Sequence, residues 1–392
     1  MQSFDAFAEH VFADEALQAE LAALRDPVAF VARMVERAAA RGIVLDPAHF
    51  APYFALDPLG LHRFRPPLVG GRGWPPRGWL PTGFFGGEGG TALSWLWFGP
   101  DPLRRPFFEM SEAEVRDLPF NRLFRYGMTL DDLVSAAPDA APPPDGFVFH
   151  MSRCGSTLVA RMLAAVDDQV VVSEPPILDA VVQFALAGQV SVATLRAIVL
   201  ALTRDRSGTT RRRFVKLFHW HALALPLFRA AFPDVPCIFL CRDPVEVLVS
   251  QRRSPGYQPV MPVVAMTLPG EAVDADLHGE RFAAWLLGRL GDAALDAVPP
   301  VRCIAYPALP EAVFDTILPH FGVEPTPTEA AVMRAATQHD AKTPDRGFTG
   351  DTGEKQREAT DDLRALAGHY CGASWARLRE RCAADTMGSV SP

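Results

Sequence analysis

The sequence predicts an α/β fold with a mainly parallel sheet, preceded by a small helical N-terminal unit and a segment rich in Pro, Gly and Trp. Three observations predict it. From Gly146 onward, apolar runs of strand length alternate with amphipathic stretches of helix length. Residues 1–58 carry helix start signals, and residues 59–144 hold too many turn residues for long helices. With 392 residues, 49% of them hydrophobic, the chain is long enough for two or three units.

Residues 1–58 carry explicit start signals for short helices. Asp26 and Asp46 each precede a proline, so each offers an N-cap followed by proline at the first helical position. An apolar stripe of helical period follows Asp26 and ends near Gly42. The stretch FDAFAEHVFADEALQAELAALRDPVAFVARMVERAAARGIVLDPAHF resembles the small helical leader-like domains associated with nitrogen-fixation loci and with precursors of ribosomal peptide natural products. The resemblance implies a peptide partner bound through residues 1–58, although any small helical bundle would show a similar pattern.

Residues 59–144 are dense in turn residues, as in PPLVGGRGWPPRGWLPTGFFGGEGG, and the apolar run TALSWLWFG follows. This composition predicts short strands and ordered loops, and then a helix from about Ser111. The many large aromatic side chains argue against disorder. We expect this segment to be a cap or connector packed on the following domain, with a substrate-binding surface as the alternative. A stiff connector, APPPD from Ala141, leads into the third unit, residues 145–392.

The third unit alternates strands with helices, which predicts a parallel sheet between layers of helices. The expected strands cover residues 146–150, 169–173, 212–218, 236–242 and 300–306. The expected helices include residues 156–166, 221–232, 243–253 and 282–295.

Net charge, the amino terminus and the cysteine spacing each argue against some classes of protein. A net charge of -8 argues against a nucleic-acid binder, so any anionic ligand needs a local cluster of cations. The amino terminus lacks the basic and apolar parts of a signal peptide, and no apolar run is long enough to span a membrane. We therefore expect a soluble cytoplasmic protein. The six cysteines form no CxxC pair, so we expect reduced core residues, no disulfide framework and no metal.

The turn between the first strand and the first helix of the third unit, SRCGST, has the layout of an anion site. Backbone N–H groups at a helix amino terminus are unpaired, and the helix dipole is positive there. Gly155 lets a ligand approach the backbone, Ser156 and Thr157 add hydroxyl groups, and Arg153 adds a permanent positive charge. One phosphate or sulfate fits such a turn, although the same residues also begin ordinary structural helices.

A second candidate anion-binding segment is FLCRDPVEVLVSQRR. Arg242 ends an expected strand, Asp243-Pro244 begins a helix, and Ser250 follows Arg242 by eight residues. Ligands of open α/β sheets bind outside the carboxyl ends of the strands. Arg242 and Arg153 are therefore expected at the same rim of the sheet.

These two stretches resemble the sulfotransferase superfamily. FHMSRCGSTL is similar to the family's 5′-phosphosulfate loop, as in its Golgi and bacterial branches, and CRDPVEVLVS is similar to its 3′-phosphate motif of an arginine and a serine eight residues apart. The resemblance covers about residues 146–355 and implies a P-loop three-layer sandwich with EC 2.8.2-like activity. The implied co-substrate is 3′-phosphoadenosine 5′-phosphosulfate, with Arg242 and Ser250 on its 3′-phosphate. The implied contacts on its 5′ side are Arg153, Cys154, Gly155, Ser156 and Thr157, where Cys154 replaces the usual serine and donates poorly.

The segment RGFTGDTGEK falls where the family closes a loop over the nucleotide. The resemblance makes Lys355 or Arg346 a candidate ligand contact. A plain surface loop is the alternative.

The proton acceptor has two candidates. Glu174 follows the second strand, where glutamate-using sulfotransferases carry their base, although an acid at a helix start has a structural role as well. If Glu174 is partly buried against an apolar acceptor, its pKa is expected to rise toward neutrality. His219 is the rival, because cytosolic sulfotransferases carry Lys-Thr-His in this strand. Lys216 is the expected cation at the transferring group, alongside Arg153, or else a salt-bridged structural lysine.

Two further groups have mainly structural interpretations. His219 and His221, two residues apart on an expected strand, would face one side and could share a metal, but no third ligand is apparent. RDRSGTTRRR, residues 204–213, is expected to be a solvated turn rather than a docking patch.

The leading hypothesis is a sulfotransferase whose acceptor is an unidentified hydroxyl or amine of a small molecule or peptide. A P-loop small-molecule kinase is one alternative, although the Gly-Lys-Ser/Thr loop and a clear magnesium-binding acid are missing from the sequence. A non-catalytic peptide-binding or regulatory protein on the same fold is the other.

Overall fold

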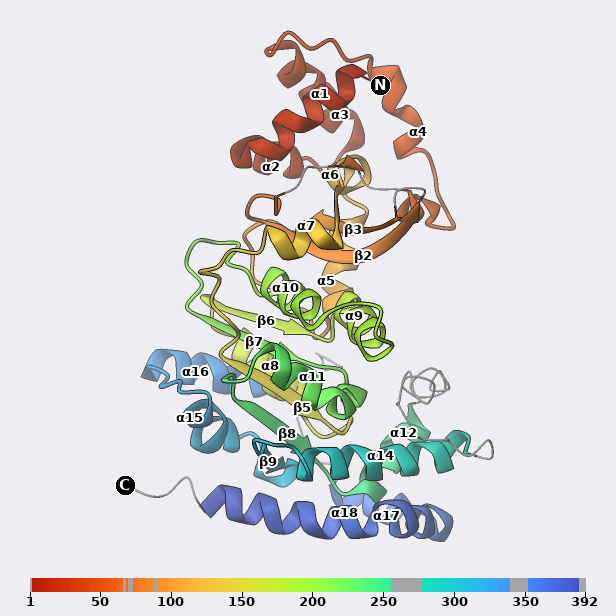
Figure 1. Cartoon of the computed structure of the whole chain (residues 1–392), viewed down its shortest axis with the longest axis vertical. Helices are drawn as coiled ribbons and strands as arrows, with labels where there is room; N and C mark the ends of the chain where they lie inside the picture. The colour runs from red at the N-terminus through yellow and green to blue at the C-terminus, as the bar shows by residue number, and fades with distance from the viewer. Residues whose placement is uncertain are drawn as a thin grey trace. The chain divides into compact units, whose positions relative to one another are not determined.

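The structure is a computed structural model that describes residues 2–65, 68–69, 73–87, 90–254, 277–338 and 352–387. It divides into two compact units, whose elements are labelled in Figure 1. The first unit holds the residues up to Pro142 together with Pro175–Leu178 and Ala197–Thr210, and the second holds Pro143–Glu174, Asp179–Arg196 and the chain from Arg211 onward. Within the described ranges, no helix combines the length and the apolar character needed to cross a membrane.

Short helices begin the first unit, and the two Asp-Pro start signals are confirmed. Asp26 accepts a hydrogen bond from the backbone N–H of Ala29, and Asp46 accepts one from Ala48. The elements are α1 (Gln2–Ala13), α2 (Glu15–Ala22), α3 (Pro27–Ala39), η1 (Pro47–Phe50), α4 (Ala51–Phe54) and η2 (Leu61–Phe64).

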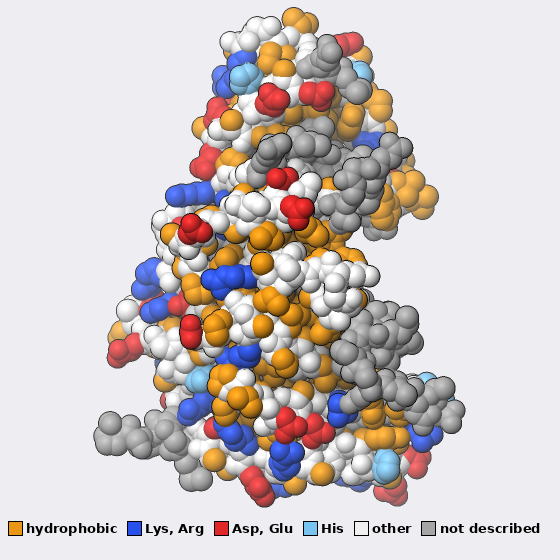
Figure 2. Space-filling view, in the orientation of Figure 1, with side chains coloured by type: hydrophobic (Ala, Val, Ile, Leu, Met, Phe, Trp, Pro, Cys, Tyr) orange, Lys and Arg blue, Asp and Glu red, His pale blue; other side chains and the backbone are white. Residues whose placement is uncertain are grey.

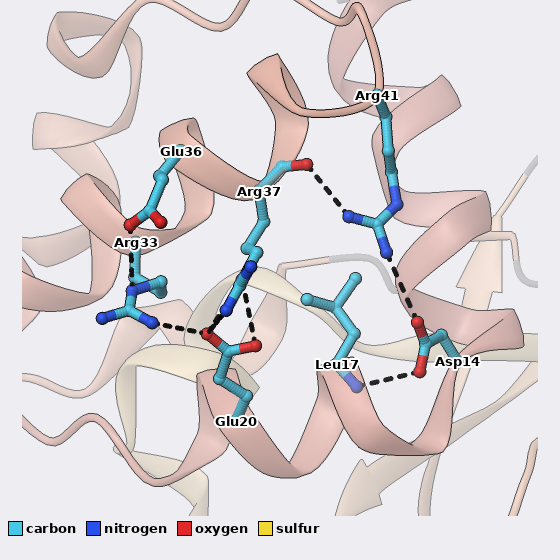
Figure 3. A network of polar contacts seen from close by, with 7 residues as sticks. All are labelled: Asp14, Leu17, Glu20, Arg33, Glu36, Arg37 and Arg41. Atoms are coloured by element: carbon cyan, nitrogen blue, oxygen red, sulfur yellow. Dashed lines mark hydrogen bonds and ion pairs between the residues drawn. The ribbon is translucent and has the colours of Figure 1, made fainter.

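A network of charged side chains links α2 to α3 (Figure 3). The carboxylate of Glu20 accepts hydrogen bonds from Arg33 at 2.7 Å and from Arg37 at 2.8 Å. Arg41, just beyond α3, reaches Asp14 at 3.4 Å. These side chains remain partly exposed to solvent, at 31–41%, so the network orients the two helices more than it stabilises the unit.

A four-stranded sheet follows in the first unit, with the strand order β1-β4-β3-β2. Strand β1 runs parallel to β4, while the pairs β4–β3 and β3–β2 are antiparallel. The strands are β1 (Leu68–Val69), β2 (Trp79–Gly87), β3 (Gly90–Trp97) and β4 (Tyr126–Thr129), with helices α5 (Phe108–Arg116), α6 (Pro119–Leu123) and α7 (Leu130–Ser135). The helix expected from about Ser111 therefore begins at Phe108.

Aromatic rings form the core of this unit. Phe12 on α1 packs edge-on against Trp79 of β2 and Tyr126 of β4, with ring centroids 5.7 and 5.2 Å apart. Phe124 contacts Phe4 at 5.6 Å and lies 6.3 Å from Phe30. The helices of residues 1–58 and the sheet that follows thus share one apolar core.

In RDRSGTTRRR, Arg206 is buried in the first unit and Arg204 is half-buried there, so the expectation of a solvated turn is wrong at these two residues. Arg206 donates to the carbonyl oxygens of Gly99 and of Asp101, and Arg204 donates to that of Pro75 at 2.8 Å. Burial lowers the pKa of each guanidinium to about 10. Paired with backbone oxygens in this way, both arginines serve packing rather than docking.

The second unit contains a five-stranded sheet with the order β6-β7-β5-β8-β9, in which every neighbouring pair is parallel. The α/β fold with a parallel sheet is confirmed. Its strands are β5 (Gly146–His150), β6 (Gln169–Ser173), β7 (Arg212–Lys216), β8 (Cys237–Cys241) and β9 (Arg302–Ala305). The strand expected over residues 212–218 ends two residues early, because the chain leaves the sheet after Lys216.

Helices cover both faces of this sheet. The connection from β5 to β6 runs one way across the sheet, and the later ones run the other way. Since such crossovers are right-handed, α8 lies on one face, and α11, α12 and α14 lie on the opposite face. The helices and short turns are α8 (Ser156–Ala164), α9 (Pro176–Leu186), α10 (Val192–Leu202), η3 (His219–Ala224), α11 (Leu225–Ala231), α12 (Pro244–Arg253), α14 (Gly279–Leu295), η5 (Tyr306–Ala308), η6 (Val313–Ile317), α15 (Leu318–His320), α16 (Pro327–Ala335), η7 (Ala336–Gln338), α17 (Thr352–Glu358) and α18 (Asp361–Met387).

The long helix α18 packs along α14 and beside the edge strand β9. Asp385 near its end accepts a hydrogen bond from the backbone N–H of Cys303 at 2.8 Å, which satisfies a donor of the edge strand. On the face shown in Figure 2, basic and acidic side chains are interspersed and neither sign forms a broad patch.

Candidate functional site

The turn between β5 and α8 has an unusual backbone. Ser152, Arg153 and Gly155 all have positive φ angles, of 73°, 50° and 86°. Two of these residues are not glycine, and left-handed non-glycine residues concentrate at functional sites. The first helical hydrogen bond of α8 runs from the N–H of Val159 to the carbonyl of Gly155, so the N–H groups of Ser156 and Thr157 precede it. Turns of this kind at helix amino termini present unpaired backbone N–H groups, so the segment remains a candidate anion site.

Close packing explains the glycine of this turn. A Cβ on Gly155 would lie 2.6 Å from a methyl carbon of Leu309 and 3.1 Å from the ring of Tyr306. Neighbouring Cys154 is fully buried, and burial raises the pKa of its thiol to about 11. The thiol is therefore enclosed in the interior. The hydroxyl-bearing Ser156 and Thr157 are also buried, at 5% and 8% exposure.

Arg242 lies beside this turn, as expected for two residues at one rim. It follows β8, which is paired directly with β5, and its Nη1 donates to the carbonyl oxygen of Arg153 at 3.4 Å. Its guanidinium stacks on the ring of Tyr306 at 3.9 Å, and its Nε donates to Glu246 at 2.6 Å. The two candidate anion-binding segments, the turn before α8 and the start of α12, are thus in direct contact. The chain leaves the neighbouring strands β5 and β8 in opposite directions across the sheet. In open α/β sheets, ligands bind in the crevice at such a point.

Neither Glu246 nor Tyr306 was anticipated as a partner of Arg242. Glu246 lies in the first turn of α12, whereas Arg242 precedes that helix, so the helical spacing rule does not predict their contact. Tyr306 belongs to the turn after β9, and only the strand order brings it close.

The remaining predicted nucleotide contacts lie on α12 and α17. Ser250 is half-buried on α12, and the guanidinium of Arg153 donates to the carbonyl oxygen of Ser254 just beyond that helix. Lys355 on α17 is buried, at 5% exposure. Arg346 lies outside the described residues.

Ion pairs and an amide hold α17 against α12. Arg253 pairs with Glu354 at 2.7 Å and also with Glu358. The side chain of Gln356 donates to Glu246 at 3.1 Å, so the ion pair of Arg242 is linked to α17.

Three side chains at the carboxyl ends of neighbouring strands form a second cluster. Glu174 follows β6, Lys216 ends β7 and His150 ends β5. The carboxylate of Glu174 accepts a hydrogen bond from the ammonium of Lys216 and lies 3.4 Å from Nε2 of His150. Lys216 is 1% exposed and also donates to the hydroxyl of Ser173 at 3.3 Å. The predicted base and the predicted cation are therefore in direct contact.

The pKa of Glu174 moves opposite to the direction expected. Burial alone would raise it, but the charge of Lys216 and the hydrogen bonds from His150 and Lys216 outweigh burial and hold it well below its usual range. The expected apolar surroundings are replaced by a buried cation. Glu174 also has a φ of 50°, and its N–H donates to the carbonyl of Lys216 at 2.8 Å.

His150 connects this cluster to the anion turn. Its Nδ1 accepts from the backbone N–H of Ser152 at 3.1 Å, and its Nε2 lies 2.8 Å from the carbonyl oxygen of Leu217. These partners fix a neutral ring with the proton on Nε2, and burial lowers the pKa of His150 in agreement with that form. The ring therefore holds the first residue of the turn in place.

His219 and His221 do not lie on a strand, which corrects the expected geometry. Both belong to the 3₁₀ turn η3, so spacing by two does not place them on one face. His221 is fully buried, and its Nε2 lies 3.1 Å from Oδ1 of Asp179. The same carboxylate oxygen accepts a hydrogen bond from the indole N–H of Trp220. Burial lowers the pKa of His219 to about 4, and its ring lies 6.5 Å from that of His150. Across the described ranges, no group of three His, Cys, Asp or Glu side chains is arranged to hold a metal ion.

No family model and no curated protein matches this chain. Among solved structures, the chain is similar to the sulfotransferase STF9 from Mycobacterium avium, with 14% sequence identity and a TM-score of 0.35, over 60% of this chain and 77% of that chain. It is also similar to the sulfotransferase domain of the Synechococcus PCC 7002 olefin synthase, with 17% identity and a TM-score of 0.32, over 60% of this chain and 90% of that chain.

Proposed function

We propose that this protein is a sulfotransferase that takes a sulfuryl group from 3′-phosphoadenosine 5′-phosphosulfate. The observation that carries the proposal is the direct contact between the two candidate anion-binding segments, where Arg242 donates to the carbonyl oxygen of Arg153 at 3.4 Å. A ligand at this rim would meet the turn before α8 and the buried Arg242, which directly follows the neighbouring strand β8. A nucleotide with separate anionic groups on its 5′ and 3′ positions fits that arrangement.

The turn at α8 is suited to the 5′ side of the donor. It offers helix N–H groups and the cation of Arg153, but the sequence places no lysine in it. Triphosphate loops use a lysine and a bound magnesium ion at this position. Arg242 and Ser250 are proposed to hold the 3′-phosphate, which a triphosphate nucleotide lacks.

The cluster of Glu174, Lys216 and His150 is suited to the transfer step. The acceptor oxygen or nitrogen attacks sulfur, the bond from sulfur to the bridging phosphate oxygen breaks, and adenosine 3′,5′-bisphosphate leaves. Lys216 neutralises charge on the transferring group, and the carboxylate of Glu174 takes the acceptor's proton. Because Lys216 pairs with Glu174 in this structure, we propose that Lys216 turns toward the donor and so frees the carboxylate to act as base.

The acceptor is proposed to be a hydroxyl or an amine of a small molecule or peptide. His219 is the alternative base, since its lowered pKa leaves it neutral at pH 7. Transfer that survives Glu174→Gln and disappears in His219→Asn would assign the proton to the histidine.

The proposal is tested first by ligand stabilisation of the full chain. Adenosine 3′,5′-bisphosphate is expected to raise Tm more than AMP does, because only the bisphosphate reaches both segments. Arg242→Ala removes that difference, and Ser250→Ala, a milder change at a half-buried position, reduces it. Equal shifts with both nucleotides in the unmodified protein would refute the arrangement of two anion-binding segments. Transfer of labelled sulfate to a panel of phenols, alcohols, sugars and peptides then tests the reaction itself.

A further inference from the structure

A cavity of about 420 Å³ lies within the first unit. Its described walls come from the short turn η2, the strands β2 and β3, the helix α5, and the chain just before β4. Small-molecule sites have volumes of roughly 300–1,000 Å³ and combine apolar walls with a few polar groups. None of the described lining residues takes part in the proposed transfer of sulfate, so this cavity needs an explanation of its own.

The floor of the cavity carries one buried hydroxyl between two glycines. Ser94 on β3 pairs with Gly83 of β2 on one side and with Gly127 of β4 on the other, so neither neighbour has a side chain at this point of the sheet. Ser94 lines the cavity and is 2% exposed. Its carbonyl oxygen accepts from Thr82 at 3.3 Å, but its hydroxyl makes no hydrogen bond to the described residues. Buried polar groups normally have a partner, so this hydroxyl points to a ligand.

Glu112 on α5 brings a carboxylate to the cavity wall. It is 7% exposed, and its Oε1 accepts a hydrogen bond from Arg116 at 2.7 Å. Its Oε2 accepts no hydrogen bond from the described residues. Burial raises the pKa of Glu112, although Arg116 acts in the opposite direction. A cationic donor from a ligand at Oε2 would therefore stabilise the charged carboxylate.

Arg125, directly before β4, brings a buried cation to the same cavity. It is 8% exposed, its guanidinium lies over the ring of Phe85 at 5.4 Å, and it donates to the carbonyl oxygen of Arg65. Burial, together with the charge of Arg65, lowers the pKa of Arg125 to about 10. Arg116 adds a second guanidinium, which is 29% exposed. An anionic group of a ligand would stabilise both cations.

One small molecule can supply both charges. The ammonium and the carboxylate of an α-amino acid are attached to the same carbon atom, so they lie side by side, as the opposite charges of Glu112 and Arg116 do. A ligand with a single charge would favour one wall and be repelled by the other, and a neutral sugar would offset neither charge. Phe84, Phe85 and Leu96 add apolar surface to the cavity, which suits an apolar side chain.

We infer that this cavity binds a free α-amino acid with an apolar or aromatic side chain. The ammonium of the ligand donates to Glu112, and its carboxylate accepts from Arg116 and Arg125. The hydroxyl of Ser94 also donates to this carboxylate, and the ligand's side chain packs against Phe84. The inference goes beyond the proposed function, because it gives the first unit a ligand that the transfer of sulfate does not require.

Calorimetric titration of the full chain tests the class of ligand. The probes are L-phenylalanine, L-leucine, N-acetyl-L-phenylalanine, which lacks the ammonium, L-phenylalaninamide, which lacks the carboxylate, and glucose. L-Phenylalanine is expected to bind about ten-fold or more tightly than each of its two derivatives, because each derivative loses one charge-assisted contact. The inference is overturned if neither amino acid binds, if a derivative binds as tightly as L-phenylalanine, or if glucose binds more tightly.

A glycine substitution tests the place of binding. Gly83 and Gly73 both lie outside the left-handed region, and a Cβ at either would meet nothing within 4 Å, so valine strains neither backbone. Only Gly83 is a described lining residue of the cavity. Gly83→Val is therefore expected to weaken L-phenylalanine about ten-fold or more by filling the floor, whereas Gly73→Val leaves the affinity unchanged. Unchanged affinity in Gly83→Val would place the ligand elsewhere and overturn the inference.

A charge substitution tests the contact with the ammonium. Glu112→Gln is expected to weaken L-phenylalanine about ten-fold and to leave N-acetyl-L-phenylalanine unchanged, because the acetylated ligand has no ammonium to lose. The control is Glu114→Gln on the same helix, whose partner Arg105 is 53% exposed, and it should affect neither ligand. Equal losses for both ligands in Glu112→Gln would contradict the assigned contact. The Tm of each ligand-free variant reports whether it is folded. None of these measurements uses the donor nucleotide, so failure of the proposed function would not be mistaken for failure of this inference.

Discussion

Arg242 and Glu246 form an ion pair that is almost completely shielded from solvent: Nε lies 2.6 Å from Oε2, and the two side chains are 3% and 4% exposed. Burying two charges is costly unless each is well bonded, and here the carboxylate also accepts from Gln356. The arginine proposed to bind a phosphate is thus held in place before any ligand arrives.

Removing the charge of Glu246 is expected to destabilise the free protein strongly. Glu246→Gln removes the buried carboxylate to which the Nε of Arg242 donates, and breaking a buried pair in this way costs about 3–5 kcal/mol. Urea unfolding measures the loss. The matched control is Glu280→Gln, whose partner Arg252 is 39% exposed, so that change should cost less than about 1 kcal/mol.

An anion at Arg242 should offset part of this loss. Adenosine 3′,5′-bisphosphate is expected to raise Tm by more in Glu246→Gln than in the unmodified protein, because its phosphate brings a negative charge in place of the one that the substitution removes. A smaller shift in the variant would indicate that Arg242 does not meet a phosphate.

The ion pair of Glu174 makes stability depend on pH. Its pKa is held below the usual 4.5, so its contribution is present above pH 4.5 and is lost as pH falls toward the folded-state value. The free energy of unfolding of the unmodified protein should therefore exceed that of Glu174→Gln at pH 7, and the difference should shrink between pH 4.5 and pH 3. A difference that is constant over this range would contradict the ion pair.

Lys216 controls the direction of that shift. In Lys216→Met the cation is gone, so burial is expected to raise the pKa of Glu174 above its usual value. Carbon-13 NMR of the labelled carboxylate measures the change. If transfer activity is established, this variant should also lose turnover, while retaining the binding of adenosine 3′,5′-bisphosphate.

Strand positions could be predicted from the sequence, because the strands of a sheet covered on both faces appear as continuous apolar runs. The strand order could not, since it depends on tertiary packing. This explains the error at Glu174: Lys216 is 42 residues away in sequence and becomes its partner only because β6 pairs with β7. The approach of Arg153 and Arg242 was predictable, because both follow strands and carboxyl ends of parallel strands share one rim. The stacking of Arg242 on Tyr306 was not.

Gly155 offers a test of the anion turn with a matched control. Gly155 and Gly188 both have positive φ angles, of 86° and 69°, so alanine strains the backbone at each by about 1 kcal/mol. Only at Gly155 would the new Cβ collide with a side chain, that of Leu309, whereas at Gly188 nothing lies within 4 Å. Gly155→Ala should therefore cost about 2–4 kcal/mol in total. It should also weaken adenosine 3′,5′-bisphosphate, while Gly188→Ala leaves the affinity unchanged.

Cys154 provides the last prediction, because it stands where the resembling family carries serine. If the hydroxyl of that serine were needed at the ligand, Cys154→Ser would strengthen nucleotide binding. In this structure the side chain is fully buried, so a serine there would place a hydroxyl in the interior. We expect Cys154→Ser to lower the free energy of unfolding by about 1–3 kcal/mol and to leave the Kd for adenosine 3′,5′-bisphosphate unchanged. Cys154→Ala separates the loss of packing from the burial of a polar group. Tighter binding by the serine variant alone would mean that the side chain at position 154 reaches the ligand after all.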